Sequence, residues 1–281
     1  MRNVCRVPQQ HTRVLEDRIR EQLVGAAPLS PSSYDTAWVA MVPARGSPQA
    51  PRFPRCVEWI VQNQHGDGSW GLIGRLPDPA LGKDALSSTM ACVLALATWG
   101  IGDEHVRKGL RFIGDNLSFV TDDRCDTPVG FNIIFPGMVG LGISMGLELP
   151  LSEADIDTIH QLRDVEMRRC AGSTASGRKA FMAYVAEGLG DLHDWDRAMP
   201  YQRRNGSFFN SPSTTAAAAI HNYDDRALHY LDSLASKFGS SVPTAYPLNV
   251  YPQLCMVDTL EKMGISNDFA SEINNILNMA Y

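Results

Sequence analysis

Three carboxylates within five residues form the pattern in this chain that comes nearest to metal-binding chemistry. They are Asp122, Asp123 and Asp126, in the order Asp-Asp-Arg-Cys-Asp. Carboxylates on adjacent helical turns can bind Mg²⁺, which prefers octahedral oxygen ligands, and can bridge the ion to a diphosphate. Pro128 argues against the helix that would align them, and without a metal each close pair would cost about 4 kcal/mol. We therefore expect a solvated acidic loop here, and no metal site.

Histidine, cysteine and glycine patterns predict no further catalytic site. No Ser-His-Asp or Cys-His arrangement is legible from spacing, and the glycines of residues 137–146 do not form a phosphate-binding loop. His221 and His229 would lie two turns apart on one helical face. We expect both to be surface or core histidines and not ligands.

A glycine-bracketed aromatic motif occurs twice in the chain. Residues 64–71 read Gln-His-Gly-Asp-Gly-Ser-Trp-Gly, and residues 202–209 read Gln-Arg-Arg-Asn-Gly-Ser-Phe-Phe. Gly66, Gly68 and Gly71 permit positive φ in a tight turn, the Asp can cap a backbone N–H, and the Gln can bond a helix end. A platform for a carbohydrate or hydrophobic ligand is one interpretation, but we predict a structural clasp between helices. The residues assigned to it are Gln64, Asp67, Gly68, Trp70, Gln202, Gly206 and Phe208.

Helices must position all of these residues. Apolar spacing predicts an amphipathic helix over residues 10–24 and a short apolar helix over 34–41, capped by the serines of 30–33. Further helices are expected at about 53–64, 85–99, 103–116, 136–147, 152–168, 178–189, 213–221, 225–238, 247–263 and 266–280. Strand alternation is nearly absent, so we predict an all-α fold. The repeated motif favours an α-α barrel, a double ring of antiparallel helices, over a simple bundle.

Composition bounds the class of protein. The 281 residues are 44% hydrophobic and 20% charged, which is enough to bury a core. A net charge of −6 with scattered Lys and Arg argues against a nucleic-acid partner. Six dispersed cysteines without a Cys-x-x-Cys pair favour free thiols, and no apolar run approaches the roughly 20 residues of a membrane span. The first twenty residues, where Glu16 and Asp17 interrupt the arginines, make a poor transit peptide.

Several segments resemble plant diterpene synthases. Residues 30–43, Ser-Pro-Ser-Ser-Tyr-Asp-Thr-Ala-Trp-Val-Ala-Met-Val-Pro, together with the 64–71 motif, are similar to the opening of that family. Residues 128–138, 183–189 and 205–217 resemble its kaurene synthase branch in particular. The sister copalyl diphosphate synthases usually carry a His-Pro-Thr-Thr-type segment where this chain has Ala-Tyr-Val. The resemblance runs from about residue 13 to the last residue.

The resemblance implies helical domains named γ, β and α, with γ inserted after the first β helix. It assigns residues 1–27 to an N-terminal segment and that first helix, 28–245 to γ, and 246–281 to the start of an incomplete, truncated β domain. The magnesium motifs of α and the Asp-x-Asp-Asp acid of β would then lie beyond Tyr281. The 122–126 stretch would fall in γ, far from the α site.

Three other acidic stretches approach these family motifs without matching them. Residues 267–275 start like the second magnesium motif but end in Asn instead of Glu, and we expect an N-capped helix. Residues 222–225 and 155–158 each lack one aspartate of the acid motif. A catalytic Asp must hold its pKa well above about 3.9 in an apolar pocket, and the neighbouring residues are too charged for that. We expect no catalytic or metal-binding residue in this chain, and assign none to substrate binding.

The leading hypothesis is the amino-terminal region of a kaurene synthase-like enzyme. The resemblance implies that the full enzyme, a lyase, uses Mg²⁺ to ionise and cyclise copalyl diphosphate to a kaurene-type diterpene in gibberellin or related diterpenoid biosynthesis. Plastid residence is implied too, although the chain as written would stay in the cytoplasm. This chain alone is expected to be inactive and to bind no cofactor. A short natural protein, a truncated gene model and a decayed copy all fit the sequence.

A second hypothesis is a non-catalytic helical module that docks onto an α domain or a copalyl diphosphate synthase. Apolar stripes are formed by Val250, Leu254, Val257, Ile265, Phe269, Ile273 and Ile276. Exposing several of them would forfeit an amount comparable to a domain's stability of about 5–15 kcal/mol. A third hypothesis is another ring-of-helices enzyme, such as a squalene cyclase or a protein prenyltransferase subunit. The zinc ligands of the prenyltransferase are not evident.

Overall fold

The computed structural model is mostly helical, which confirms the all-α prediction. It describes residues 9–24, 29–72, 79–122, 127–171, 175–190, 194–247 and 251–280. The longer helices are α1 (Gln9–Val24), α2 (Ser33–Ala40), α3 (Pro54–Gln62), α4 (Pro79–Trp99), α5 (Asp103–Asp115), α6 (Phe131–Ser144), α7 (Glu153–Ala171), α8 (Ala175–Tyr184), α10 (Pro212–His221), α11 (Asp225–Phe238), α12 (Tyr251–Lys262) and α13 (Ala270–Ala280). The shorter helical segments are α9 (Trp195–Ala198), η1 (Leu117–Thr121), η2 (Ala186–Gly188), η4 (Met199–Tyr201) and η5 (Ser266–Phe269). None of these helices is both long and apolar enough to cross a membrane.

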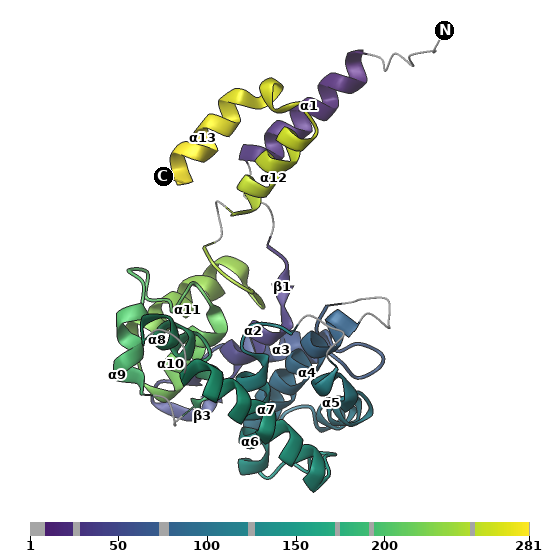
Figure 1. The fold of residues 1–281 in the computed structure, drawn as a ribbon, viewed down its shortest axis with the longest axis vertical. Coiled ribbons are helices and arrows are strands. Elements are labelled where there is room, and N and C mark those ends of the chain that lie inside the picture. Colours follow the sequence, from purple (N-terminus) through teal and green to yellow (C-terminus); the bar gives the residue numbers. More distant parts are fainter. Residues whose placement is uncertain are drawn as a thin grey trace. The chain divides into compact units, whose positions relative to one another are not determined.

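The described residues form two compact units, which Figure 1 shows. The larger unit is Ser30–Ala245, and the smaller unit consists of the described parts of residues 1–29 and 246–281. The strands of the described residues all lie in the larger unit and are short: β1 (Pro31–Ser32), β2 (Pro43–Ala44), β3 (Ser47–Pro51) and β4 (Val242–Pro243). They form two antiparallel pairs, β1 with β4 and β2 with β3.

The larger unit contains α2 near its centre. Ser32 caps this helix, because its Oγ accepts a hydrogen bond from the Asp35 backbone N–H at 3.2 Å. Every residue from Asp35 to Ala40 is buried, since α4 and α10 pack against α2. In the β1–β4 pair Ser32 lies opposite Val242. This pair joins the first and last segments of the larger unit beside the start of α2.

The largest differences from the predicted helix starts are in α4 and α6, which both begin earlier than expected. α4 begins at Pro79 instead of residue 85, and α6 begins at Phe131 instead of residue 136. The predicted start of α6 is at Pro136, but this proline lies inside the helix. A proline there removes one backbone hydrogen bond, and burial of Phe135 and Pro136 offsets that loss. Gly130, at φ +83°, turns the chain into the helix one residue before Phe131.

The smaller unit is formed by α1, α12, η5 and α13 (Figure 1). Its buried core consists of Leu23, Val257, Leu260, Phe269, Ile273 and Ile276. The Gln253 side chain reinforces it by donating from Nε2 to the Leu23 carbonyl at 3.0 Å. Val250 lies outside the described residues. For the described members of the apolar stripes, the expectation that they need an external cover is wrong, because they cover one another and the end of α1.

Candidate functional site

The first glycine–aromatic turn joins the end of α3 to α5. Gln64 donates from Nε2 to the carbonyls of Gly68 and His105, both at 2.9 Å. Trp70 is fully buried, and its indole N–H donates to the Ile60 carbonyl at 2.8 Å. The turn thus fixes the end of α3, the Trp70 ring and the start of α5 relative to one another.

The second turn repeats this arrangement between η4 and α11. Gln202 donates from Nε2 to the Gly206 carbonyl at 3.1 Å and to Asp224 Oδ2 at 2.9 Å. Phe208 is fully buried, and its backbone N–H donates to Thr215 Oγ1 at 2.9 Å. In the first copy Trp70 makes the equivalent bond to a threonine of α4 at 3.0 Å.

Both turns also share an internal cap and a left-handed glycine. Asp67 and Asn205 each accept from the backbone N–H two residues later, at 2.9 Å and 3.1 Å. Gly68 has φ +92° and Gly206 has φ +90°, a conformation that favours glycine. Gly66 lies outside that region, so the turn does not use the positive φ that a glycine permits there. In each turn these bonds connect the chain to the neighbouring helices.

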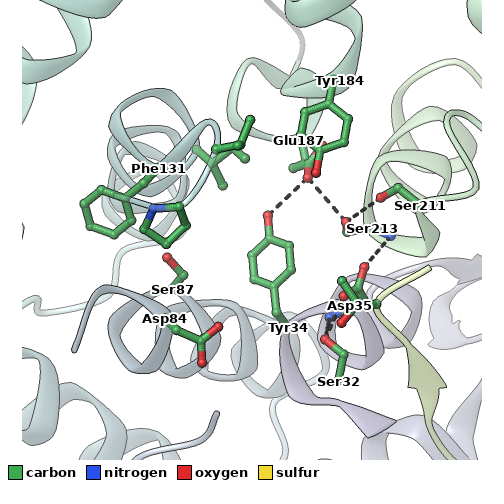
Figure 2. Close-up of a pocket in the computed structure, with 14 residues that line it drawn as sticks. Ser32, Tyr34, Asp35, Asp84, Ser87, Phe131, Tyr184, Glu187, Ser211 and Ser213 are labelled. Carbon is green, nitrogen blue, oxygen red and sulfur yellow. Dashed lines mark hydrogen bonds between the residues drawn. The ribbon is translucent and has the colours of Figure 1, made fainter. Parts of the chain in front are cut away.

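A cavity of about 320 Å³ lies in the larger unit beside the first turns of α2 and α10 (Figure 2). Its polar lining includes three carboxyl groups, on Asp35, Asp84 and Glu187. Its aromatic lining consists of Tyr34, Phe131 and Tyr184. Six helical segments, α2, α4, α6, α8, η2 and α10, therefore meet at this cavity.

Asp35 sits in the first turn of α2 and is 3% exposed. Its carboxylate accepts from the Ser32 hydroxyl at 2.7 Å and from the Ser213 backbone N–H at 3.1 Å. The Ser213 N–H belongs to the first turn of α10, where backbone donors have no helical partner. Asp35 therefore links the start of α2 to the start of α10, as Figure 2 shows.

Glu187 lies in η2 and is 7% exposed. Its Oε1 accepts from the Tyr34 and Ser213 hydroxyls, both at 3.3 Å (Figure 2). Its Oε2 lies 3.0 Å from Thr214 Oγ1, which is also 3.1 Å from the Tyr184 carbonyl. Through these contacts Glu187 joins η2 to both α2 and α10.

Burial changes the proton affinity of this cluster. It raises the pKa of Asp35 to about 6, against the opposing effect of the bonds from Ser32 and Ser213. Burial, with a smaller contribution from the nearby negative charge of Asp35, also raises the pKa of Glu187 to about 7. The pKa of the Tyr34 phenol rises well above its ordinary value, first because of burial and then because of Glu187.

The cluster can hold a proton near neutral pH, but it does not fit a metal ion. A carboxyl with a pKa near 7 is suited to donating or accepting a proton. Magnesium is usually held by one or two charged carboxylates together with water or phosphate oxygens, whereas the raised pKa of Glu187 favours the neutral form of its carboxyl. Among the residues that the structure describes, no group of three or more His, Cys, Asp or Glu side chains could hold a metal. No step is therefore assigned to Mg²⁺ here.

Of the acidic residues singled out in the sequence, those that the structure describes do not line this cavity. Asp122 follows η1, whereas Asp123 and Asp126 lie outside the described residues. Asp155 forms a reciprocal cap with Ser152 at the start of α7, and that hydrogen bond lowers the pKa of Asp155. A lowered pKa is the opposite of what a protonated catalytic acid needs.

The other acidic residues and histidines considered in the sequence make ordinary structural contacts or are exposed. Asp224 caps α11 by accepting from two backbone N–H groups, and Asp225 forms an ion pair with Arg45. His221 stacks on the Trp195 ring at 6.2 Å, whereas His229 is exposed. Residues 267–275 are helical, but η5 begins without a side-chain cap, so the expected N-cap is wrong.

Sequence reasoning did not single out Asp35 or Glu187. Both residues lie within segments that carry the family resemblance, Asp35 in 30–43 and Glu187 in 183–189. One signal was available for Asp35: it is the only charged residue in the apolar run from Tyr34 to Val42, and a charge in a buried helix needs hydrogen-bonding partners. Glu187 carried no such signal, because its burial depends on α2 and α10, which are distant in sequence.

Comparison with known sequences gives a consistent set of relatives. Residues 194–281 match the model described as terpene synthase, N-terminal domain. Stemod-13(17)-ene synthase of Oryza sativa subsp. indica is 64% identical over 94% of this chain and 32% of its own length. A chloroplastic ent-kaur-16-ene synthase of Oryza sativa subsp. japonica is 58% identical over 97% of this chain and 36% of its own. This chain thus spans about a third of the length of these relatives.

Comparison with solved structures identifies a similar fold in a protein of the same kind as these sequence relatives. Abietadiene synthase from Abies grandis superposes with a TM-score of 0.86 and 34% sequence identity. The match covers 97% of this chain and 36% of that protein. The helical arrangement of this chain is therefore that of the terpene synthases.

Proposed function

Because this chain belongs to the plant diterpene synthase family, we propose that it forms the amino-terminal helical region of a kaurene synthase-like enzyme. The observation that carries this proposal is that the relatives align with almost all of this chain, which accounts for only about a third of their own length. In the whole enzyme, magnesium-dependent ionisation and cyclisation of copalyl diphosphate would occur on residues outside this region. The chain by itself would form no product.

The proposal assigns residues 28–245 to the γ domain and residues 1–27 with 246–281 to parts of the β domain. The larger compact unit begins at Ser30 and ends at Ala245, close to these boundaries, which supports the assignment. The packing of α1 with α13 supports it as well, because it joins the two segments on either side of the insertion.

Within this region the Asp35–Glu187 cluster serves as a structural clasp. Its two carboxyls accept hydrogen bonds from the first turns of α2 and α10, and these bonds satisfy buried polar groups that would otherwise cost free energy. No group of potential metal ligands accompanies them among the described residues. The role proposed for the cluster is therefore to hold the helices of the γ domain together.

Two enzymatic assays test the proposed function. The purified chain, incubated with copalyl diphosphate and Mg²⁺, should give no diterpene by gas chromatography. A chimera in which this chain replaces the aligned region of the rice stemod-13(17)-ene synthase should form the product of that enzyme. Product formation by the isolated chain would contradict the first part of the proposal. A soluble but inactive chimera would contradict the second.

A docking role is the second proposal, with an α domain or a copalyl diphosphate synthase as partner. Its support is the exposure of large apolar side chains in the smaller unit: Val14 at 58%, Leu15 at 54% and Met263 at 65%. Co-purification with a synthase that lacks its own amino-terminal region should yield a complex. The proposed compartment is the plastid, on the evidence of the chloroplastic relatives, and a fluorescent fusion of the full-length protein would test it.

A further inference from the structure

A second cavity, of about 310 Å³, lies in the larger unit among α7, α8 and α9. Arg163 and Met167 reach it from α7, Arg178 and Met182 from α8, and Leu189 from the segment after η2. Leu189 is buried, and the two methionines and two arginines are half-buried. The cavity thus combines an apolar floor with cationic side chains, and it shares no lining residue with the cavity beside Asp35.

The cations around this second cavity outnumber the acids. Arg163, Arg178, Lys179 and Arg197 face one carboxylate, that of Asp194. Asp194 is already engaged, because it lies 2.8 Å from Arg197 Nε and also caps α9. Within the part of the chain that the structure describes, the other three cations form no ion pair. This concentration of positive charge stands out in a chain whose net charge is −6.

We propose that this α7–α8–α9 pocket binds an amphiphilic anion, a phosphate ester of an apolar alcohol. Several cations without an ion pair among the described residues suit a multiply charged head group, and guanidinium groups bind phosphate oxygens in pairs. The methionines and Leu189 suit the attached chain, since methionine side chains adapt to apolar ligands of varied shape. A cavity of this size, mostly apolar with a few convergent polar groups, is typical of small-molecule sites. The inference is independent of the function proposed above.

The phosphate could be esterified to an isoprenoid or to a straight alkyl chain. Calorimetric titration of the full chain with geranyl phosphate and with octyl phosphate distinguishes these sources. One or both of the two phosphate esters should bind more tightly than inorganic phosphate, by about tenfold or more. Burying a few methylene groups contributes more free energy than a tenfold change in affinity requires. Binding should weaken as salt is added, and octyltrimethylammonium, with the opposite charge, should not bind. Equal affinity for inorganic phosphate, or equal binding of the ammonium compound, would overturn the proposal.

Two sets of variants localise the ligand. Arg163→Gln combined with Arg178→Gln should weaken octyl or geranyl phosphate at least about tenfold, because hydrogen bonds between charged groups are lost. The matched control is Arg168→Gln with Arg169→Gln, two exposed arginines of α7 outside the pocket, and it should bind normally. Met167→Gln should weaken binding of the chain-bearing phosphates without changing binding of inorganic phosphate. Unchanged affinity in the Arg163/Arg178 variant, with a normal circular dichroism spectrum, would refute the site.

Discussion

At the scale of single residues, the proton count around Thr214 identifies the form of Glu187 that fits the site. The Thr214 hydroxyl has one proton, yet its oxygen lies 3.1 Å from the Tyr184 carbonyl and 3.0 Å from Glu187 Oε2. A carbonyl can only accept, so the hydroxyl proton is best used there. Glu187 Oε2 then completes the second bond only if it carries a proton. The raised pKa of Glu187, about 7, agrees with this hydrogen-bond pattern.

This buried pair should make the stability of the larger unit depend on pH. The ordinary pKa values are 3.8 for Asp and 4.5 for Glu, against about 6 and about 7 in the folded chain. Between those limits the folded state holds protons that the unfolded state has released. The free energy of unfolding therefore falls as pH rises from about 4 to about 7.

Glu187→Gln should reduce this pH dependence. The amide mimics the protonated carboxyl, since its NH₂ group can donate to Thr214 while its oxygen accepts from Tyr34 and Ser213. The variant should match wild type near pH 4.5 and exceed it at pH 8, by up to about 3 kcal/mol. Urea unfolding followed by Trp fluorescence at both pH values measures the difference. Glu148→Gln, at an exposed position, is the control, and a variant that keeps the full wild-type pH slope would contradict the assignment.

A second residue-scale prediction concerns the close approach at Gly68. A Cβ added there would lie 2.6 Å from the Lys108 carbonyl oxygen, and φ is +92°. Gly146 has a similar φ of +78° but open space around it. Gly146→Ala should therefore cost only the left-handed penalty of about 1–2 kcal/mol, and Gly68→Ala should cost clearly more. Equal losses in thermal unfolding would mean that α5 can shift away from the turn.

At the scale of elements, local pattern located the helices well but not every boundary. The expected helix at 225–238 matches α11, and the one at 103–116 ends one residue beyond α5. Both have a polar start and a clear apolar face. The predicted start of α6 lies five residues after the observed one. The helix includes Pro136 because burial of this residue outweighs the lost hydrogen bond. The same tertiary override explains why the region after α8 turns into η2 instead of continuing as one helix to residue 189.

The candidate site was less predictable than the helices. The Ser30–Ser33 cap and the clasp residues could be read from the sequence, since their partners lie nearby along the chain. The contacts of Glu187 with Tyr34 and of Asp35 with Ser213 span 153 and 178 residues. No local pattern specifies such pairs, because they exist only after α2, η2 and α10 have packed.

Arg20 provides an element-scale prediction for the smaller unit. Its guanidinium on α1 donates to Glu272 Oε1 at 2.5 Å and to the Asp268 carbonyl at 2.6 Å, and it stacks over the Phe269 ring. An ammonium group cannot make this forked contact. Arg20→Lys should therefore speed amide hydrogen exchange in α1 and α13, whereas Arg18→Lys, at an exposed position, should not. Unchanged exchange in both variants would show that the apolar core alone holds these helices.

At the scale of the whole molecule, the two units differ in how much core they bury. The smaller unit relies on one cluster of six buried apolar residues, whereas most of the buried hydrophobic side chains lie in Ser30–Ala245. Small units bury a smaller fraction of their surface and are correspondingly less stable. All five tryptophans, Trp38, Trp59, Trp70, Trp99 and Trp195, belong to the larger unit. Two spectroscopic signals can therefore separate the units.

We expect thermal unfolding in two steps, with the smaller unit unfolding first. Far-UV circular dichroism reports helices of both units and should show both transitions, whereas Trp fluorescence should show only the upper one. Phe269→Ala removes a fully buried ring from the smaller unit, at a cost of about 3–5 kcal/mol, and should lower only the first transition. Gly68→Ala should lower only the second. If the two signals coincide, and if each variant shifts both of them equally, the units unfold as one cooperative body and their separate cores are not the basis of stability.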